Sequence, residues 1–207
     1  FPRPFMISRH NQSAFKYLGI DISQREDGII VYQKHYIQCV TTVHVSADRQ
    51  LQSDDQLTKE ERTEYLSLLG KISWLAQITR PDLKFDVYTF SRCNKTPTVQ
   101  NLLDLNSVVS KVHKNHRWIR FPKLDLRKPW KVVVYSDGSF GNLDNKVNSA
   151  RGYIVMLCDG NGACLLTWNS NKITRVVTST LESETMALRD GVRHAELLRT
   201  MLCQLLY

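Results

Sequence analysis

Two carboxylates lie two positions apart in the segment RVVTSTLESETMAL, residues 175–188. Ser179 and Glu182 have the S-x-x-E spacing of a capping box, in which the glutamate accepts a hydrogen bond from a free backbone N–H at the helix start. Two residues along a helix correspond to a rotation of about 200°, so Glu182 and Glu184 should face nearly opposite sides. We therefore expect Glu182 to be a solvent-facing cap residue, with its carboxylate near the backbone N–H of Ser179, and Glu184 to point at the protein.

Glu184 shares its predicted helix face with small and apolar residues. These are Leu188, Gly191, Ala195, Leu198, Leu202 and Leu205. A carboxylate on a buried face is costly unless it is protonated, paired or bound to a metal. Asp137 follows the apolar run VVVYS and is the natural partner. Converging carboxylates supply the hard oxygen ligands that Mg²⁺ prefers, and Mn²⁺ accepts the same ligands. The pattern predicts that Asp137 and Glu184 are catalytic metal ligands with carboxylates about 4–6 Å apart. The alternative is that Glu184 is only a first-turn acid favoured by the helix dipole.

Positive charge is concentrated in residues 111–131, here called the basic strip, which hold eight Lys or Arg, two tryptophans and one acid, Asp125. The whole chain has a net charge of +8. A basic segment with interleaved aromatic residues is typical of a surface that binds a phosphate backbone, although a solvated helix end and linker would look the same. The candidate nucleic-acid contacts are Lys111, Lys114, Arg117, Arg120, Lys123, Arg127 and Lys128.

Cysteine usage and hydropathy exclude several classes of protein. Five cysteines without a C-x-x-C pair indicate reduced thiols inside a cell, in the cytoplasm or the nucleus. No apolar run reaches the ~18 residues of a membrane span, so no membrane partner is expected. The start FPRPFMISRH has no signal-peptide pattern, and the position of Met6 suggests a fragment.

The elements that must position these residues follow from hydrophobic periodicity. KYLGIDIS, residues 16–23, alternates like a half-buried strand, and an Asp27-Gly28 turn followed by IIVY completes a predicted hairpin. A first helix is predicted within residues 57–78, with Thr58 and Glu61 as its capping box. A second helix is predicted to start at Pro81, and a third to span about residues 99–112. The predicted buried side chains of the first and third helices are Leu68, Ile72, Leu75, Ala76, Leu102, Leu105, Val109 and Val112.

A boundary is expected near Pro129. The run KVVVYSDG beyond it is nearly continuous in apolar residues, which suits a central strand buried on both faces. RGYIVMLC and ACLLTWN form a second predicted hairpin around the turn sequence DGNG, and a helix from about Thr180 runs to the end. The second half therefore reads as three antiparallel strands followed by a helix.

Several segments together resemble the Pol polyproteins of copia-type retrotransposons. YLGIDI…GIIVYQKHYI, YLSLLGKISWLAQITRPDLKFDVYTFSR, VVVYSDGSF, TWNSNKITRVV and STLESETMAL occur in the order found from the end of the reverse transcriptase into the ribonuclease H domain. The resemblance implies an α+β chain. Residues 1–55 would be the tail of the polymerase palm, 56–129 a helical thumb or connection segment, and 130–207 a ribonuclease H-like β-β-β-α unit truncated after its first helix. It also implies that Asp137 and Glu184 match the first two acidic metal ligands of ribonuclease H.

The sequence also departs from that family. The polymerase signature of an aromatic residue, any residue and two aspartates is absent, because Asp54-Asp55 lies in LQSDDQL and reads as a loop before a helix. The family's next catalytic aspartate lies on a fourth strand beyond this chain, and Asp144 and Asp159 read as loop and turn residues. Two hypotheses follow. The first is a fragment of a reverse transcriptase and ribonuclease H, whose parental activities are RNA-directed DNA synthesis and Mg²⁺-dependent cleavage of the RNA strand of an RNA–DNA hybrid, with the rest of the Pol polyprotein as partner. The second is a truncated remnant that only binds nucleic acid or a protein partner.

Overall fold

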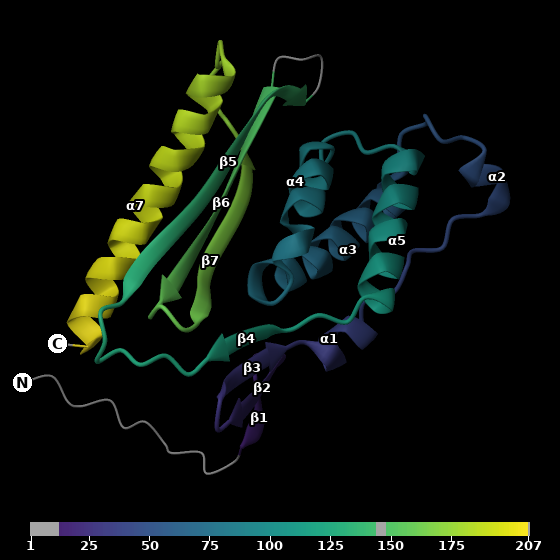
Figure 1. The fold of residues 1–207 in the computed structure, drawn as a ribbon. Helices are drawn as coiled ribbons and strands as arrows, with labels where there is room; N and C mark the ends of the chain where they lie inside the picture. The colour runs from purple at the N-terminus through teal and green to yellow at the C-terminus, as the bar shows by residue number, and fades with distance from the viewer. Residues whose placement is uncertain (1–12, 144–147, 207) are drawn as a thin grey trace, which may run out of the picture.

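A computed structural model describes residues 13–143 and 148–206 (Figure 1). These residues form two antiparallel sheets, six α-helices and one short 3-10 helix. The expected α+β class is confirmed. No helix within the two described ranges has the length and apolarity needed to cross a membrane.

The N-terminal sheet has the strand order β1-β2-β3-β4. Its strands are Ala14–Tyr17 (β1), Ile20–Arg25 (β2), Gly28–Tyr32 (β3) and Ile119–Pro122 (β4). β4 comes from the segment predicted as thumb or connection, yet it pairs antiparallel with β3 and completes the sheet of the predicted palm tail. Strand pairing therefore joins two stretches that are far apart in the sequence.

The predicted single strand over residues 16–23 is wrong, because the chain reverses direction in its middle. Tyr17 pairs with Ile20 across a two-residue turn in which Leu18 and Gly19 have φ values of 49° and 77°. Positive φ at both positions is what a tight hairpin turn requires. Glycine adopts this conformation at little cost, but leucine rarely does, so the alternation of apolar residues was misleading here. The expected hairpin between β2 and β3 is confirmed, with Arg25 opposite Gly28.

The helical part contains the three predicted long helices and two short ones. Their bounds are Lys34–Gln38 (α1), Ala47–Gln50 (α2), Lys59–Ile78 (α3), Pro81–Leu83 (the 3-10 helix η1), Lys84–Arg92 (α4) and Val99–Lys114 (α5). The capping box of Thr58 and Glu61 at the start of α3 is present. All eight side chains predicted to be buried on α3 and α5 belong to the largest apolar core. Periodicity was sufficient here because each helix buries one continuous face.

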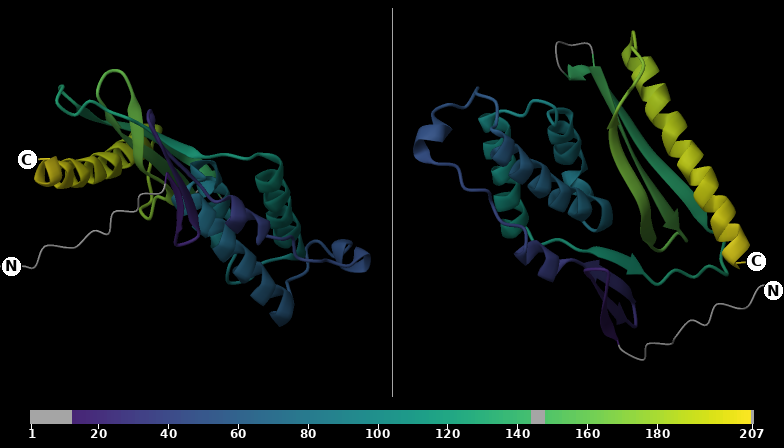
Figure 2. Two further views of the ribbon diagram at one scale, coloured as in Figure 1. Left: turned by 90° about the horizontal axis from the view of Figure 1, so that it is seen from below. Right: turned by 180° about the vertical axis from the view of Figure 1, so that it is seen from behind.

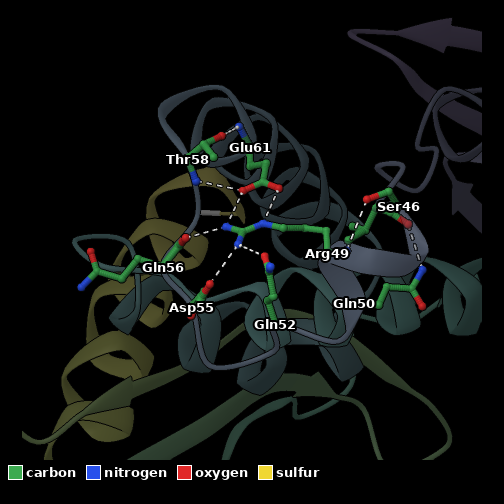
Figure 3. A network of polar contacts seen from close by, with 9 residues as sticks. Ser46, Arg49, Gln50, Gln52, Asp55, Gln56, Thr58 and Glu61 are labelled. Carbon is green, nitrogen blue, oxygen red and sulfur yellow. Dashed lines mark hydrogen bonds and ion pairs between the residues drawn. The ribbon is translucent and has the colours of Figure 1, made fainter.

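Arg49 connects α2 to the first turn of α3 through a polar network (Figure 3). Its guanidinium donates to both carboxylate oxygens of Glu61, at 3.0 and 3.1 Å, and also to Gln52 Oε1, Asp55 Oδ2 and the carbonyl oxygen of Gln56. The hydrogen bonds from Arg49 hold the pKa of the Glu61 carboxyl below its usual range. Asp55 thus lies in a loop before a helix, as expected.

The C-terminal unit consists of a three-stranded sheet and one long helix. Its strands, in the order β5-β6-β7, are Lys131–Leu143, Asn148–Cys158 and Ala163–Lys172, and α7 spans Thr180–Leu206. The three antiparallel strands and following helix are confirmed. The central position expected for β5 is wrong, because within the described sheet β6 is central and β5 is an edge strand whose Tyr135 is 62% exposed. A run of valines does not distinguish an edge from a centre when one face is covered by a helix.

The two faces of this sheet are covered by different elements. α7 runs along one face, where Tyr153, Val155 and Ala195 form a small core, and α4 approaches the other face (Figures 1 and 2). The indole Nε1 of Trp168 on β7 donates to the carbonyl oxygen of Ala76 near the end of α3, at 2.8 Å. α4 and the end of α3 therefore lie against the face of the second sheet that α7 leaves uncovered.

Candidate functional site

The start of α7 lies directly against the middle of β5, at Gly138. A Cβ atom added at Gly138 would come within 2.5 Å of the backbone carbon and oxygen of Ser183 and within 2.7 Å of the backbone nitrogen of Glu184. Ser183 is fully buried, and its hydroxyl donates to the carbonyl oxygens of Thr180 and Gly138, at 2.7 and 3.4 Å. The absence of a side chain at residue 138 thus allows the helix start to reach the strand beside Asp137.

Glu184 points at the sheet, as predicted. Its Oε2 accepts a hydrogen bond of 3.1 Å from the backbone N–H of Gly138, the residue that follows Asp137. β5 is an edge strand in the described sheet, and edge strands present backbone groups that no neighbouring strand pairs. The glutamate therefore satisfies one backbone donor in the middle of β5, at the residue that follows Asp137.

Glu182 caps the start of α7, as predicted, but its carboxylate accepts hydrogen bonds from the residue before the expected donor. The backbone N–H of Glu182 donates to Ser179 Oγ at 3.2 Å, which is one half of the expected capping box. Its own Oε2 accepts from the backbone N–H and the hydroxyl of Thr178, at 2.8 and 3.1 Å, and not from the N–H of Ser179. Thr178 offers two donors to one oxygen, and this explains the shift.

The predicted buried stripe of α7 is wrong in part. Leu188 and Leu205 are 51% and 79% exposed. The buried positions are the small residues Ser183, Ala187, Gly191 and Ala195. A Cβ at Gly191 would lie 2.6 Å from Val134 Cγ1, so small residues are needed where the helix approaches the sheet most closely. Glu184 follows Ser183, the first buried residue of this stripe, and is half-buried.

Asp137 is exposed and lies on the other side of the sheet from α7. Side chains alternate along a strand, so Asp137 shares a face with Tyr135, whereas Gly138 contacts the helix. Asp137 and Tyr135 line a cavity of about 310 Å³ whose opposite wall includes Asp82, Lys84 and Phe85 from η1 and α4. Sequence analysis missed this wall, because it lies across the predicted boundary near Pro129 and nothing local to Asp82–Phe85 signals the contact.

The described residues offer a limited ligand set for Mg²⁺. Residues 13–143 and 148–206 contain no group of three or more His, Cys, Asp or Glu side chains placed to hold a metal ion. Asp159 is a turn residue, as expected. Its Oδ1 accepts from the backbone N–H groups of Asn161 and Gly162, and its Oδ2 from that of Asp125. These N–H groups hold the pKa of the Asp159 carboxyl below its usual range. Asp144 lies outside the described residues.

Two neighbouring carboxylates suit one Mg²⁺ ion that keeps several waters or substrate oxygens. The structure brings the Glu184 carboxylate to the backbone N–H of Gly138, whereas the Asp137 side chain leaves the opposite face of the sheet, so the two carboxylates could share an ion only at the open edge of β5 in the described sheet. The role of both residues as metal ligands, and the predicted separation of their carboxylates, stay predictions.

The basic strip spans the end of α5, β4 and the loop that leads into β5. Four of the seven predicted contact residues form ion pairs. These pairs are Lys111–Asp86, Arg117–Asp82, Arg120–Asp27 and Arg127–Asp125. Lys114, Lys123 and Lys128 are exposed and form no ion pair with another described residue. Three of the four acids come from outside the strip, so sequence analysis overestimated its free positive charge.

Comparison with known proteins identifies one relative that matches across most of its own length. Secreted RxLR effector protein 161 of Plasmopara viticola is 30% identical over 132 residues, which cover 63% of this chain and 88% of that protein. The chain belongs to the same family as this effector. No protein-family model matches this chain, and no solved structure matches it.

A second relative connects the chain to transposable elements. The putative transposon Ty5-1 protein YCL074W of Saccharomyces cerevisiae is 22% identical over 174 residues. The match covers 78% of this chain but 54% of that protein, so the chain spans about half the length of this relative. The similarity supports a distant relation to a retrotransposon protein.

Proposed function

We propose that the chain derives from the region of a copia-type Pol polyprotein that joins the reverse transcriptase to ribonuclease H, and that it binds RNA–DNA hybrid or another nucleic acid. The similarity to the Ty5-1 transposon protein over 78% of the chain supports the origin. The order of the described elements, a small sheet, three long helices and then three strands and a helix, agrees with it.

The observation that carries the ribonuclease H part is the hydrogen bond between Glu184 Oε2 and the backbone N–H of Gly138. It brings an acid near the start of α7 to the middle of β5, the strand that carries a second acid, Asp137. In the proposed site both carboxylates hold Mg²⁺, which when bound supplies a Lewis acid and an activated water for phosphodiester hydrolysis. Gly138 and Ser183 keep the helix start close enough for Glu184 to reach.

The second candidate function is binding without cleavage. The described residues supply two carboxylates beside β5 and no third acid that joins them. We therefore expect the 207-residue chain by itself to bind nucleic acid and to show little or no hybrid cleavage in Mg²⁺. Strong cleavage that Asp137→Asn abolishes would contradict this and favour the complete nuclease.

The binding test is the salt dependence of affinity for a short RNA–DNA hybrid. Each lysine that neutralises a phosphate contributes about 0.9 to the slope of log K against log salt concentration. Replacing Lys114, Lys123 and Lys128 together by Ala should make that slope shallower by about 2–3. The matched control replaces three basic residues outside the strip, Lys59, Lys95 and Arg175. Equal slopes for the two triple variants would refute the assignment of the strip and favour a protein partner.

We also propose an intracellular location, in the cytoplasm or nucleus, with the rest of a Pol polyprotein as partner. The five cysteines are unpaired in the structure, which fits a reducing compartment. The name of effector protein 161 describes that relative as secreted, which is the competing location. Thiol labelling of the protein recovered from its native cells distinguishes them, since five reactive thiols after denaturation support the intracellular location and disulfide-linked cysteines oppose it.

A further inference from the structure

A second cavity lies on one face of the N-terminal sheet, far in sequence from the two carboxylates. Its volume is about 470 Å³. Arg25 on β2 and Tyr32 on β3 line it, and the pairing of Asp21 with Tyr32 and of Arg25 with Gly28 puts both on the same face. Arg117 and Trp118, in the segment that leads into β4, also line it.

The lining is cationic. Arg25 and Lys34 contribute two positive charges, Arg117 contributes a third that its ion pair with Asp82 partly offsets, and none of the described residues that line the cavity is acidic. Arg117 also contacts Asp82 at 3.8 Å, but its side chain is 62% exposed and remains part of the lining. Asp27 on the β2–β3 turn pairs with Arg120, Asp21 opposite Tyr32 contacts His35 Nδ1 at 3.0 Å, and neither acid lines the cavity. An anion is the complementary ligand.

Two aromatic side chains accompany these cations. Trp118 is 60% exposed, and tryptophan side chains are on average largely buried in folded proteins. Tyr32 lines the cavity from the face of the sheet. Aromatic faces next to Arg or Lys are the usual means of binding a nucleobase together with its phosphate. A purely inorganic anion would use the cations but would leave these rings unused.

A buried donor without a partner provides an independent indication of a ligand. Gln33 lines the cavity and is 1% exposed. Its Oε1 accepts a hydrogen bond of 2.8 Å from the hydroxyl of Thr79, and this fixes the orientation of the amide. Its Nε2 has no hydrogen-bond partner among the described residues. Leaving a buried N–H unpaired is unfavourable, and a ligand oxygen in the cavity would remove that cost.

We propose that this cavity binds one nucleotide unit. Arg25, Lys34 and Arg117 hold the phosphate, Trp118 stacks on the base, and Gln33 Nε2 donates to a ligand oxygen. The unit is either a free nucleotide or one residue of a single strand. This goes beyond the function proposed above, because it needs neither the carboxylate pair nor the three unpaired lysines of the basic strip.

The test is calorimetric titration of the 207-residue chain with AMP, adenosine and inorganic phosphate. AMP should bind, and adenosine should bind at least about tenfold more weakly because the charge-assisted bonds to phosphate are lost. The double variant Arg25→Ala/Lys34→Ala should weaken AMP binding by about tenfold or more, since both side chains are exposed and their loss leaves the core intact. Trp118→Ala should weaken AMP binding and leave phosphate binding unchanged.

The matched control is Lys59→Ala/Lys95→Ala, which removes two exposed lysines elsewhere and should bind AMP like the wild type. A single-stranded hexamer of deoxyadenylate that binds at least about tenfold more tightly than AMP identifies a strand as the source, and equal affinity identifies the free nucleotide. The inference is overturned if AMP does not bind at about millimolar concentration, if adenosine binds equally well, or if the Arg25/Lys34 variant binds AMP normally. The triple variant of Lys114, Lys123 and Lys128 should retain AMP binding, so failure of the hybrid-binding proposal remains distinguishable.

Discussion

Replacing Gly138 by Ala should disrupt the contact that positions Glu184. The added Cβ would lie 2.5 Å from the carbon and oxygen of the Ser183 backbone and 2.7 Å from the Glu184 nitrogen. Backbone atoms cannot rotate away as a side chain could, so either β5 or the whole start of α7 must move. Overpacking in a well-packed interior costs about 1–3 kcal/mol, and the absence of a flexible neighbour places this substitution near 3 kcal/mol. For a chain of 207 residues this corresponds to a fall in Tm of about 6–12 °C.

The assay is urea unfolding followed by circular dichroism, with thermal melting as the second measurement. The control is Gly70→Ala in α3, because a Cβ there meets nothing within 4 Å and Ala is favoured over Gly in a helix by about 0.5–1 kcal/mol. Amide hydrogen exchange in the first turns of α7 should become faster in Gly138→Ala and remain unchanged in Gly70→Ala. A Gly138→Ala protein with wild-type stability would refute the close packing of α7 on β5, and with it the placement of Glu184.

Three further predictions concern the same layers. Glu182→Gln should leave stability and Mg²⁺ affinity nearly unchanged, because the amide oxygen still accepts the cap hydrogen bonds, whereas Glu184→Gln should keep the fold and lose Mg²⁺ binding measured by calorimetry. Asp82→Asn should destabilise the protein by about 3 kcal/mol in urea unfolding, since it removes the carboxylate that pairs with the fully buried Arg80 at 2.9 Å. Burial raises the pKa of the Asp82 carboxyl, but the opposing hydrogen bonds and charge of Arg80 outweigh it and leave the pKa below its usual value of 3.8. The stabilisation is therefore complete above that value and is lost as pH falls through the lower folded-state pKa, so stability measured below pH 3.8 should fall less steeply in Asp82→Asn than in the wild type. Trp168→Phe should cost about 1 kcal/mol through loss of the hydrogen bond to the end of α3, and an unchanged unfolding curve would contradict the packing of the helices on the second sheet.

The orientation of the two glutamates could be predicted from the sequence because it depends on local geometry. A rotation of about 200° separates Glu182 from Glu184, and the serine three residues before Glu182 fixes which of them is the cap. The depth of Glu184 could not be predicted in the same way. Burial along α7 depends on where the helix approaches the sheet, and the close contacts of Gly138 and Gly191 set this line one position away from the expected leucines.

Local patterns determined the helices, their caps and the apolar faces of α3 and α5, because the interactions that decide them span three or four residues. They also determined the identity of the candidate acids and cations. Tertiary structure alone decided which charges are free. Asp27, Asp82 and Asp86 neutralise cations of the basic strip from positions 25 to 93 residues away, and no local rule predicts such pairs. Tertiary structure also decided that β4 joins the first sheet, that β5 is an edge strand, and that Arg25, Gln33 and Trp118 line one cavity. Strand pairing is selected by the packing of whole faces against one another, and that information is spread over the entire chain.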